Sequence, residues 1–398
     1  MRARVLAVAV LTAALSACGG GSGGGGPPVT TGTNVAPLIV DAGPGGTSVN
    51  LPFVTVTVCV PGTSTCQTID HVLLDTGSTG LRLVNEGLGT SPIALPQALS
   101  AAGDPLQECF QFADGYTWGS VRTADIQVAD GTASNVPVQL IGDPSSPAVP
   151  ADCPNGAVPE NNVVSFGANG VLGVSVFRED CGPACVAIAN PNGQGAFYGC
   201  PASGCVGTTV ALIAQPQNPV YHFATNNNGV AVEMPTISSA GQLSARGSLI
   251  LGIGTQTNNQ LGGAAVLTLG TSGEFTTTYN GTPLTFSFID SGSNAYFFND
   301  SALTPCVKNV GFYCPARTTL AAVNTGKNGV VSDVAFDVAD ADALTANNPT
   351  FSALPNVAGT NSLASSFDWG LPFFYGRRVY VAIEGQSTSA GLGPFVAY

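Results

Sequence analysis

The sequence contains one pattern twice, roughly half the chain apart: Leu73-Leu74-Asp75-Thr76-Gly77-Ser78 and Phe288-Ile289-Asp290-Ser291-Gly292-Ser293. In each copy an apolar run leads into an aspartate, a hydroxyl residue, a glycine and a serine. The apolar run predicts a buried strand. The glycine lets the backbone turn tightly beside the aspartate, and the hydroxyl groups donate hydrogen bonds to it. The sequence therefore predicts two similar turns that each present one carboxylate.

Asp75 and Asp290 are the candidate catalytic residues. If the two turns face each other, their carboxylates lie so close that both cannot ionise, and they share a proton. One carboxylate then activates a water as a general base, while the other protonates or hydrogen-bonds a scissile carbonyl. The alternative is two unrelated turns in which each aspartate caps its own backbone. Because both copies follow apolar strands at the spacing of one lobe, we favour the paired site.

Three further motifs extend the pattern into a resemblance to the pepsin-like aspartic peptidases. Asn169-Gly170-Val171-Leu172-Gly173 resembles the second signature of their N-terminal lobe. Residues 247–252 (GSLILG) resemble the strand that opens the C-terminal lobe, and residues 390–396 (AGLGPFV) resemble the last strand. These landmarks follow the order of that family, and the chain is most similar to an uncharacterised group of bacterial lipoproteins with this fold.

The resemblance implies an all-β, bilobal fold with two β-barrel-like lobes, residues 34–208 and 209–398, and an active-site cleft between them. It also implies that Thr76 and Ser291 form a hydroxyl grip beneath the dyad. The remaining residues implied as dyad support are Gly77, Ser78, Gly292 and Ser293.

Several positions depart from the family pattern. Residues 112–128 match the spacing of the flap hairpin, but Phe112 stands where the flap tyrosine is expected, and the nearest replacement is Tyr116. The tryptophan that supports the flap tyrosine is replaced by Arg82. In the C-terminal lobe the apolar-apolar-glycine signature is read as Gly370-Leu371-Pro372. We expect a rebuilt flap.

The N-terminus predicts export. Basic residues precede an apolar run that ends in Leu15-Ser16-Ala17-Cys18, which resembles the bacterial lipobox. We expect a signal peptide over residues 1–17, lipidation of Cys18 and a Gly-rich tether over residues 18–33. Gly19 follows the cysteine where an inner-membrane retention signal has Asp, so we expect an outer-membrane lipoprotein facing the periplasm or the cell surface. An ordinary signal peptide with an incidental cysteine is the alternative.

Ten cysteines remain besides Cys18, an even number that predicts five disulfides in an oxidising compartment. A possible zinc site is the alternative for one cluster of four cysteines: Cys181, Cys185, Cys200 and Cys205. Its spacings lack the usual two-residue knuckles, and neither histidine is near it in sequence, so disulfides are favoured. We expect no metal site.

Composition agrees with an exported β protein. The 398 residues are 44% hydrophobic, and 51 Gly with 28 Pro leave room for short helices only, such as one near residues 95–102. A net charge of −13 argues against a nucleic-acid partner, because no basic surface is available to neutralise phosphates. No phosphate-binding or dinucleotide motif occurs, so we expect no cofactor. The expected molecule is a monomer.

Two functional interpretations remain. The first is an aspartic endopeptidase that hydrolyses a peptide or protein substrate with a water activated by the dyad. The second is a catalytically silent binding or inhibitor module at the cell surface that retains the peptidase-like fold. Two complete motifs favour the first interpretation, and the altered flap favours the second.

Overall fold

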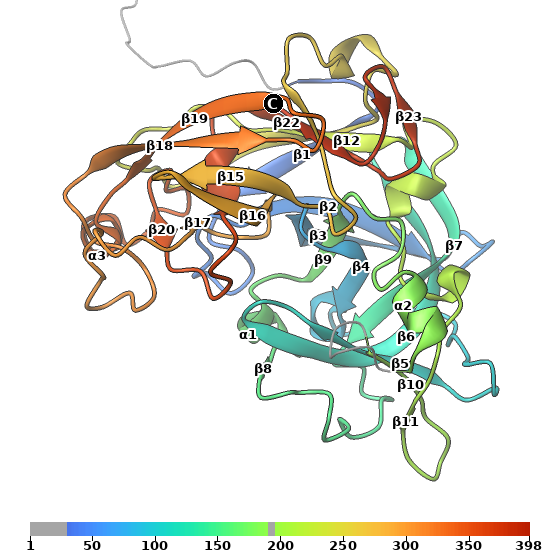
Figure 1. Ribbon diagram of the computed structural model, residues 1–398. Coiled ribbons are helices and arrows are strands. Elements are labelled where there is room, and N and C mark those ends of the chain that lie inside the picture. Colours follow the sequence, from blue (N-terminus) through green and yellow to red (C-terminus); the bar gives the residue numbers. More distant parts are fainter. Residues whose placement is uncertain (1–29, 190–195) are drawn as a thin grey trace, which may run out of the picture.

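The computed structural model describes residues 30–189 and 196–398 of the chain, and the regular secondary structure within them is mostly β-strand (Figure 1). The predicted signal peptide, Cys18 and most of the tether lie outside the described residues. The all-β, bilobal fold class is confirmed. No helix among the described residues is both long enough and apolar enough to cross a membrane.

One sheet of 16 strands runs through both halves of the chain. Its strands from the first half are β1 (Val35–Val40), β2 (Pro52–Cys59), β3 (Cys66–Asp75), β4 (Thr79–Val84), β5 (Leu106–Gln111), β6 (Gly115–Val128), β7 (Gly131–Ile141), β8 (Val158–Pro159), β9 (Gly170–Val174), β10 (Ala196–Gly199) and β11 (Val206–Gly207). Its strands from the second half are β12 (Gly229–Glu233), β13 (Ala245–Leu251), β14 (Val266–Thr268), β22 (Arg378–Ala382) and β25 (Phe395–Ala397).

A second sheet of seven strands belongs to the second half alone. It contains β15 (Phe275–Tyr279), β16 (Thr282–Ile289), β17 (Tyr296–Phe297), β18 (Thr318–Thr325), β19 (Val331–Val338), β20 (Ala358–Gly359) and β21 (Asp368–Trp369). A small hairpin pairs β23 (Ser387–Thr388) with β24 (Gly391–Leu392). The described α-helices are α1 (Val163–Phe166), α2 (Pro183–Ala187) and α3 (Ala341–Asn347).

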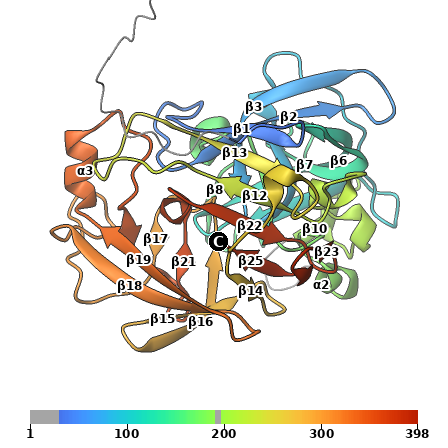
Figure 2. The ribbon, with the colours of Figure 1, turned by 90° about the horizontal axis from the view of Figure 1, so that it is seen from above.

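The two halves are joined by strand pairing. β1 pairs antiparallel with β13 along its whole length, from Val35↔Ile250 to Val40↔Ala245. β13 continues through β12 and β22 to β25, and Figure 2 shows these strands side by side between the two lobes. The predicted landmark at residues 247–252 therefore falls largely in β13 of this joining sheet, whereas residues 390–396 run from β24 of the small hairpin into β25 of the joining sheet. The predicted boundary at residue 208 falls between β11 and β12 and stays a prediction.

Alternating side chains explain strand β2, whereas β4 and β9 are buried along their whole length. In β2, Val54, Val56 and Val58 are buried while Thr55 is exposed, as a half-buried strand requires. β16 breaks this rule, because Ser287 is buried and Phe286 is 54% exposed. The Ser287 hydroxyl satisfies the buried backbone by donating to Leu284 O and accepting from Phe367 N.

The short helix expected near residues 95–102 is wrong. The segment is irregular and extended, and Ala98 bonds to β6 through its N–H to Val121 O, 2.9 Å away. Pro96 explains the difference, because the residue before a proline is pushed out of the helical region. The Gln97 side-chain amide lies within hydrogen-bond distance of three backbone carbonyls, those of Ala98, Leu106 and Val121, and so ties the segment to β5 and β6.

Stacked aromatic side chains form the core that packs against the second sheet. Phe367 and Trp369 stack with ring centroids 4.1 Å apart, and Phe298 stacks on Phe367 at 4.7 Å. Trp369 is fully buried, and its indole N–H donates to Thr277 Oγ1 at 3.1 Å. Residues 367 and 369 therefore point into this core, and alternation turns the side chain between them, Asp368, to the other side of the strand.

Five disulfides are confirmed. They join Cys59–Cys66, Cys109–Cys153, Cys181–Cys185, Cys200–Cys205 and Cys306–Cys314. The four cysteines considered as a possible zinc site therefore form two disulfides, Cys181–Cys185 and Cys200–Cys205. Four bridges close loops of eight residues or fewer, whereas Cys109–Cys153 spans 44 residues.

The long bridge is expected to contribute most to stability. Replacing Cys109 and Cys153 together by serine should lower the free energy of unfolding by about 4 kcal/mol, because a long loop regains much chain entropy on unfolding. The matched control, Cys59 with Cys66, should cost about 2 kcal/mol. Urea unfolding of the two double variants measures the difference, and equal losses would contradict the prediction.

Candidate active site

The two motif turns lie at the ends of similar strands. β3 ends at Asp75, and β16 ends at Ile289, one residue before Asp290. Each strand has a parallel neighbour, β9 beside β3 and β21 beside β16. The signature read as Asn169 to Gly173 is that neighbour in the first half, with Asp75 opposite Gly173. The local architecture around the two aspartates is therefore repeated.

Reciprocal hydrogen bonds hold the two turns together. Thr76 N donates to Ser291 Oγ at 3.1 Å, and Ser291 N donates to Thr76 Oγ1 at 2.9 Å. Each hydroxyl then donates across to the opposite strand, Thr76 to Ile289 O at 3.2 Å and Ser291 to Leu74 O at 2.7 Å. The two halves of the chain are locked together directly beneath the aspartates.

Each glycine of the motif packs against the carboxyl group of the other half. A Cβ at Gly77 would lie 2.6 Å from Asp290 Cγ, and a Cβ at Gly292 would lie 2.8 Å from Asp75 Cγ. Any side chain at either position would therefore strike a carboxylate. The structure brings Asp75 and Asp290 together across the lobe interface, and glycine is needed at both turns for that approach.

Both carboxylates accept hydrogen bonds from their own turns. Asp75 accepts from Gly77 N at 2.7 Å, from Ser78 N at 3.2 Å and from the Ser78 hydroxyl. Asp290 accepts from Gly292 N at 2.8 Å and from Ser293 Oγ at 3.0 Å. The residues expected to support the dyad thus all contact it or its turns.

Burial shapes the electrostatics of the pair. Burial raises the pKa of Asp290 well above its ordinary value, and the nearby charges of Asp75 and Asp368 raise it further. Loss of the proton from Asp290 is therefore opposed. Such a proton belongs to the coupled pair rather than to one residue.

The second-half signature differs from the prediction, which placed it at residues 370–372. Asp368 and Trp369 form β21 and pair with Phe288 and Ile289 of β16, which places Gly370 opposite Asp290. A Cβ at Gly370 would lie 2.1 Å from Ala295 O, so this glycine is the counterpart of Gly173. The prediction was offset because it read Gly370 as the first residue of the signature, whereas it is the last.

Because the signature was predicted two residues too late, a third carboxyl group near Asp75 and Asp290, that of Asp368, was missed. Asp368 is 6% exposed, and its Oδ2 lies 2.5 Å from Ser293 Oγ, within hydrogen-bond distance. Its Oδ1 has no hydrogen-bond partner. Burial raises the pKa of Asp368 to about 8, against the opposing hydrogen bond from Ser293. In the sequence, Asp368 could have been recognised as a buried acid because it stands alone between two aromatic residues, Phe367 and Trp369.

Arg82, which replaces the expected tryptophan, forms a buried ion cluster. Its Nη2 donates to Glu108 Oε1 at 2.9 Å and to Asp180 Oδ2 at 2.7 Å, and all three side chains are fully buried. Its guanidinium lies 3.6 Å from the ring centroid of Phe110. Burial and the neighbouring Glu108 raise the pKa of Asp180 well above its ordinary value, and Arg82 lowers it. β4 and the β5–β6 hairpin are joined by this cluster.

The hairpin itself turns at residues 112–115, where Phe112 N donates to Gly115 O at 2.8 Å. Phe112 packs edge-on against Phe110 and Phe166, at 4.7 and 5.6 Å. Tyr116 is buried in a different cluster with Trp118 and the Cys109–Cys153 bridge, and it pairs with Gln111 on the strand. The expectation that Tyr116 replaces the flap tyrosine is therefore wrong, because alternation turns it away from the Arg82 side of the hairpin, where Phe110 lies.

A cavity of about 290 Å³ adjoins the dyad turn. Thr76 and Gly77 line one side of it, and Phe288 and Ile289, just before Asp290, line another. The other lining side chains are mainly apolar and come from both halves of the chain: Ser175, Val176, Phe177, Leu269, Ser272, Gly273, Glu274, Phe286, Val381 and Val396. The exposed side chain of Phe286 therefore lines the cavity beside the candidate site.

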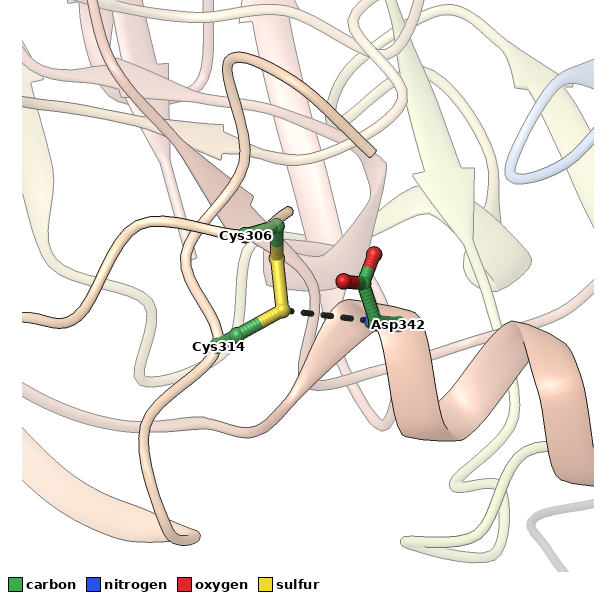
Figure 3. Close-up of side chains that lie close together, drawn as sticks. All are labelled: Cys306, Cys314 and Asp342. Carbon is green, nitrogen blue, oxygen red and sulfur yellow. Dashed lines mark hydrogen bonds between the residues drawn. A yellow bond between two sulfur atoms is a disulfide. The ribbon is translucent and has the colours of Figure 1, made fainter. Parts of the chain in front are cut away.

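Cys306, Cys314 and Asp342 lie close enough to resemble a metal site (Figure 3). The two sulfurs are bonded to each other, so neither is a thiolate ligand. The Asp342 carboxylate accepts backbone N–H groups of residues 307, 308 and 309, and its own N–H donates to Cys314 Sγ at 3.3 Å. This cluster is a stabilised loop rather than a metal centre.

Comparisons with known proteins agree with this architecture. The model of a family described as a protein of unknown function, DUF3443, matches residues 30–398. No protein of curated function matches the sequence. The crystal structure of an aspartic proteinase from Irpex lacteus is similar to 91% of this chain over 96% of its own length, with a TM-score of 0.53 and 15% identity. The chain therefore belongs to the DUF3443 family, and its fold is that of the pepsin-like aspartic proteinases.

Proposed function

We propose that this protein is an aspartic endopeptidase with Asp75 and Asp290 as its catalytic pair. The observation that carries the proposal is the reciprocal Thr76–Ser291 grip, which brings two carboxyl groups together between the lobes. A structural role alone does not require two buried like charges at one point, because such a pair costs stability. A shared proton at that point supplies both an acid and a base.

The proposed mechanism uses that proton. The ionised carboxylate takes a proton from a water, which attacks the scissile carbonyl carbon, while the protonated carboxyl hydrogen-bonds the carbonyl oxygen. The tetrahedral intermediate then breaks its C–N bond as the amine nitrogen receives a proton from the pair. The two hydroxyl groups that bond the outer carboxylate oxygens, from Ser78 and Ser293, keep both groups oriented during this exchange.

The cavity beside the dyad supports an apolar substrate side chain. Phe177, Phe286 and Phe288 offer aromatic surface there, and about 290 Å³ accommodates a large side chain. We infer an extended peptide with an apolar residue near the cleaved bond as the substrate class.

A catalytically silent binding module is the second candidate. It is favoured by the Arg82 cluster and by Phe112, which stand where the family pattern places a tryptophan and a flap tyrosine. A flap without its tyrosine hydroxyl loses one hydrogen bond to a bound peptide. Such a protein would still bind extended chains in the cleft.

Digestion of a peptide library by the purified protein between pH 3 and 7 distinguishes the two candidates. The endopeptidase should cleave peptides with apolar residues beside the cut, and pepstatin, which carries a hydroxyl in place of the attacked carbonyl, should block cleavage. Binding of pepstatin or of library peptides with no cleavage at any pH would favour the binding module.

Export as a lipoprotein is proposed from Leu15-Ser16-Ala17-Cys18. Replacing Cys18 by serine should move the protein from the detergent phase to the aqueous phase on phase separation, because the acyl chains would be missing. Replacing the neighbouring Ser16 by alanine keeps a small residue at the cut and should leave partitioning unchanged. A Cys18→Ser protein that still partitions with detergent would refute the anchor.

A further inference from the structure

Asp368 breaks the symmetry of the site. In the first half, β9 places Val171 two residues before Gly173, where β21 places Asp368 two residues before Gly370. An apolar residue in the first half thus corresponds to a buried carboxyl group in the second. The dyad therefore has an acidic neighbour on one side only.

The Ser293 hydroxyl connects this carboxyl group to the dyad. Its Oγ lies 3.0 Å from Asp290 Oδ2 and 2.5 Å from Asp368 Oδ2. A hydroxyl group has one proton to donate. If the hydroxyl donates its proton to one of the two carboxylates, the other carboxyl group can bond to Ser293 Oγ only when it is itself protonated and donates to that oxygen. At least one proton must therefore reside on Asp290 or Asp368, in addition to the proton of Ser293.

We propose that Asp75, Asp290 and Asp368 act as one unit of three carboxyl groups linked through Ser293, and that its working form carries two protons and one negative charge. Once Asp368 ionises, it takes the Ser293 hydrogen bond and adds charge beside the dyad. Loss of the last dyad proton then requires three buried negative charges, so the dyad keeps its proton to higher pH. This regulation rests on the proposed endopeptidase function.

Among the described residues, no cation compensates the charge that Asp368 acquires when it ionises. The titratable group facing it from the turn after β16 is Asp290, and the one facing it from the end of β3 is Asp75. On β17, Tyr296 packs against Trp369 and Phe336 instead. The influences on its carboxyl group are burial, Ser293 and Asp75, and no Lys, Arg or His is among them. Of these influences, only the hydrogen bond from Ser293 favours its ionisation.

Thermal unfolding tests the protonation of Asp368 without any substrate. The pKa of Asp368 is about 8 in the folded protein and about 3.9 in an unfolded chain. Because the folded value is raised, its contribution to stability is fully present below about pH 4 and is lost as pH rises toward 8. The melting temperature of the natural protein minus that of Asp368→Asn should therefore fall steadily across this window. A constant difference would overturn the proposal.

Two controls isolate the effect. Asp368→Val copies the residue at the corresponding first-half position, and it should show the same trend if Asp368→Asn folds poorly. Asp342→Asn removes a carboxylate whose pKa is lowered by the backbone N–H of Lys308 and its neighbours. That difference should stay constant above about pH 5 and shrink only at lower pH.

The pH profile of cleavage then tests the link to the dyad. In both Asp368 variants the alkaline limb of kcat/KM should move to lower pH by about one unit, because a like charge near the dyad raises its pKa by this order. An unchanged limb would overturn the coupling. If no peptide is cleaved, infrared spectra still decide the inference: the natural protein at neutral pH should carry one more protonated carboxyl group than Asp368→Asn, and equal bands would overturn it.

Discussion

Replacing Arg82 by leucine is expected to lower the free energy of unfolding by about 3–5 kcal/mol at neutral pH. The guanidinium bonds two buried carboxyl groups, Glu108 and Asp180, and also Thr79 O at 2.7 Å. Without it both carboxyl groups remain buried with no cation. The leucine fills the space, so the loss reflects the uncompensated acids rather than a cavity.

The pH dependence of that loss identifies its cause. Both acids of the variant should have raised pKa values in the folded state, so their protonated forms stabilise the protein at low pH and this contribution is lost as pH rises. The penalty should therefore be smaller at pH 4 than at pH 7 in chemical unfolding. Arg317→Leu is the control, because Arg317 is 54% exposed in its pair with Asp337 and should cost at most about 1 kcal/mol. Equal penalties at the two sites would contradict the argument.

The features that could be predicted from the sequence are those encoded by neighbouring residues or by a repeated motif. Each aspartate motif carries its strand, turn and hydroxyl groups within six residues, so the sequence alone identifies the two aspartates that the structure brings together and the groups that bond them. Close cysteine pairs were predictable for the same reason. The partners of Arg82 were not, because Glu108 and Asp180 lie 26 and 98 residues away and only the folded chain brings them together.

Two predictions failed where a pattern was read without its register. The second-half signature was placed two residues late, because an aspartate in a buried strand does not match an apolar pattern. Tyr116 was placed in the flap by its distance along the chain, whereas alternation along β6 turns it to the opposite face. The helix near residues 95–102 failed because Pro96 outweighed its apolar spacing.

Asparagine at Asp75 or at Asp290 is expected to reduce kcat/KM by roughly 10⁴-fold or more. The amide keeps the shape of the carboxyl group but has neither an exchangeable acid proton nor a base. Because the two groups act as one unit, the double variant should be scarcely worse than either single one. Activity of the natural protein should follow a bell-shaped pH profile, since one group must be ionised and the other protonated.

Stability measurements separate lost chemistry from lost folding. The pKa of Asp290 is raised in the folded protein, chiefly by burial, so its ionisation opposes folding as pH rises. Asp290→Asn should therefore melt at a higher temperature than the natural protein at neutral pH even though it cleaves nothing. Asp130→Asn, at an exposed turn, should leave both cleavage and melting unchanged.

Binding of pepstatin completes the test of the dyad. Pepstatin carries a hydroxyl in place of the attacked carbonyl, so the natural protein should bind it and both asparagine variants should bind it far less tightly. A natural protein that binds pepstatin but cleaves no peptide would retain the geometry of the pair and lack the chemistry. Asparagine variants that cleave peptides as well as the natural protein does would instead show that the Thr76–Ser291 grip joins two lobes without building a catalytic site.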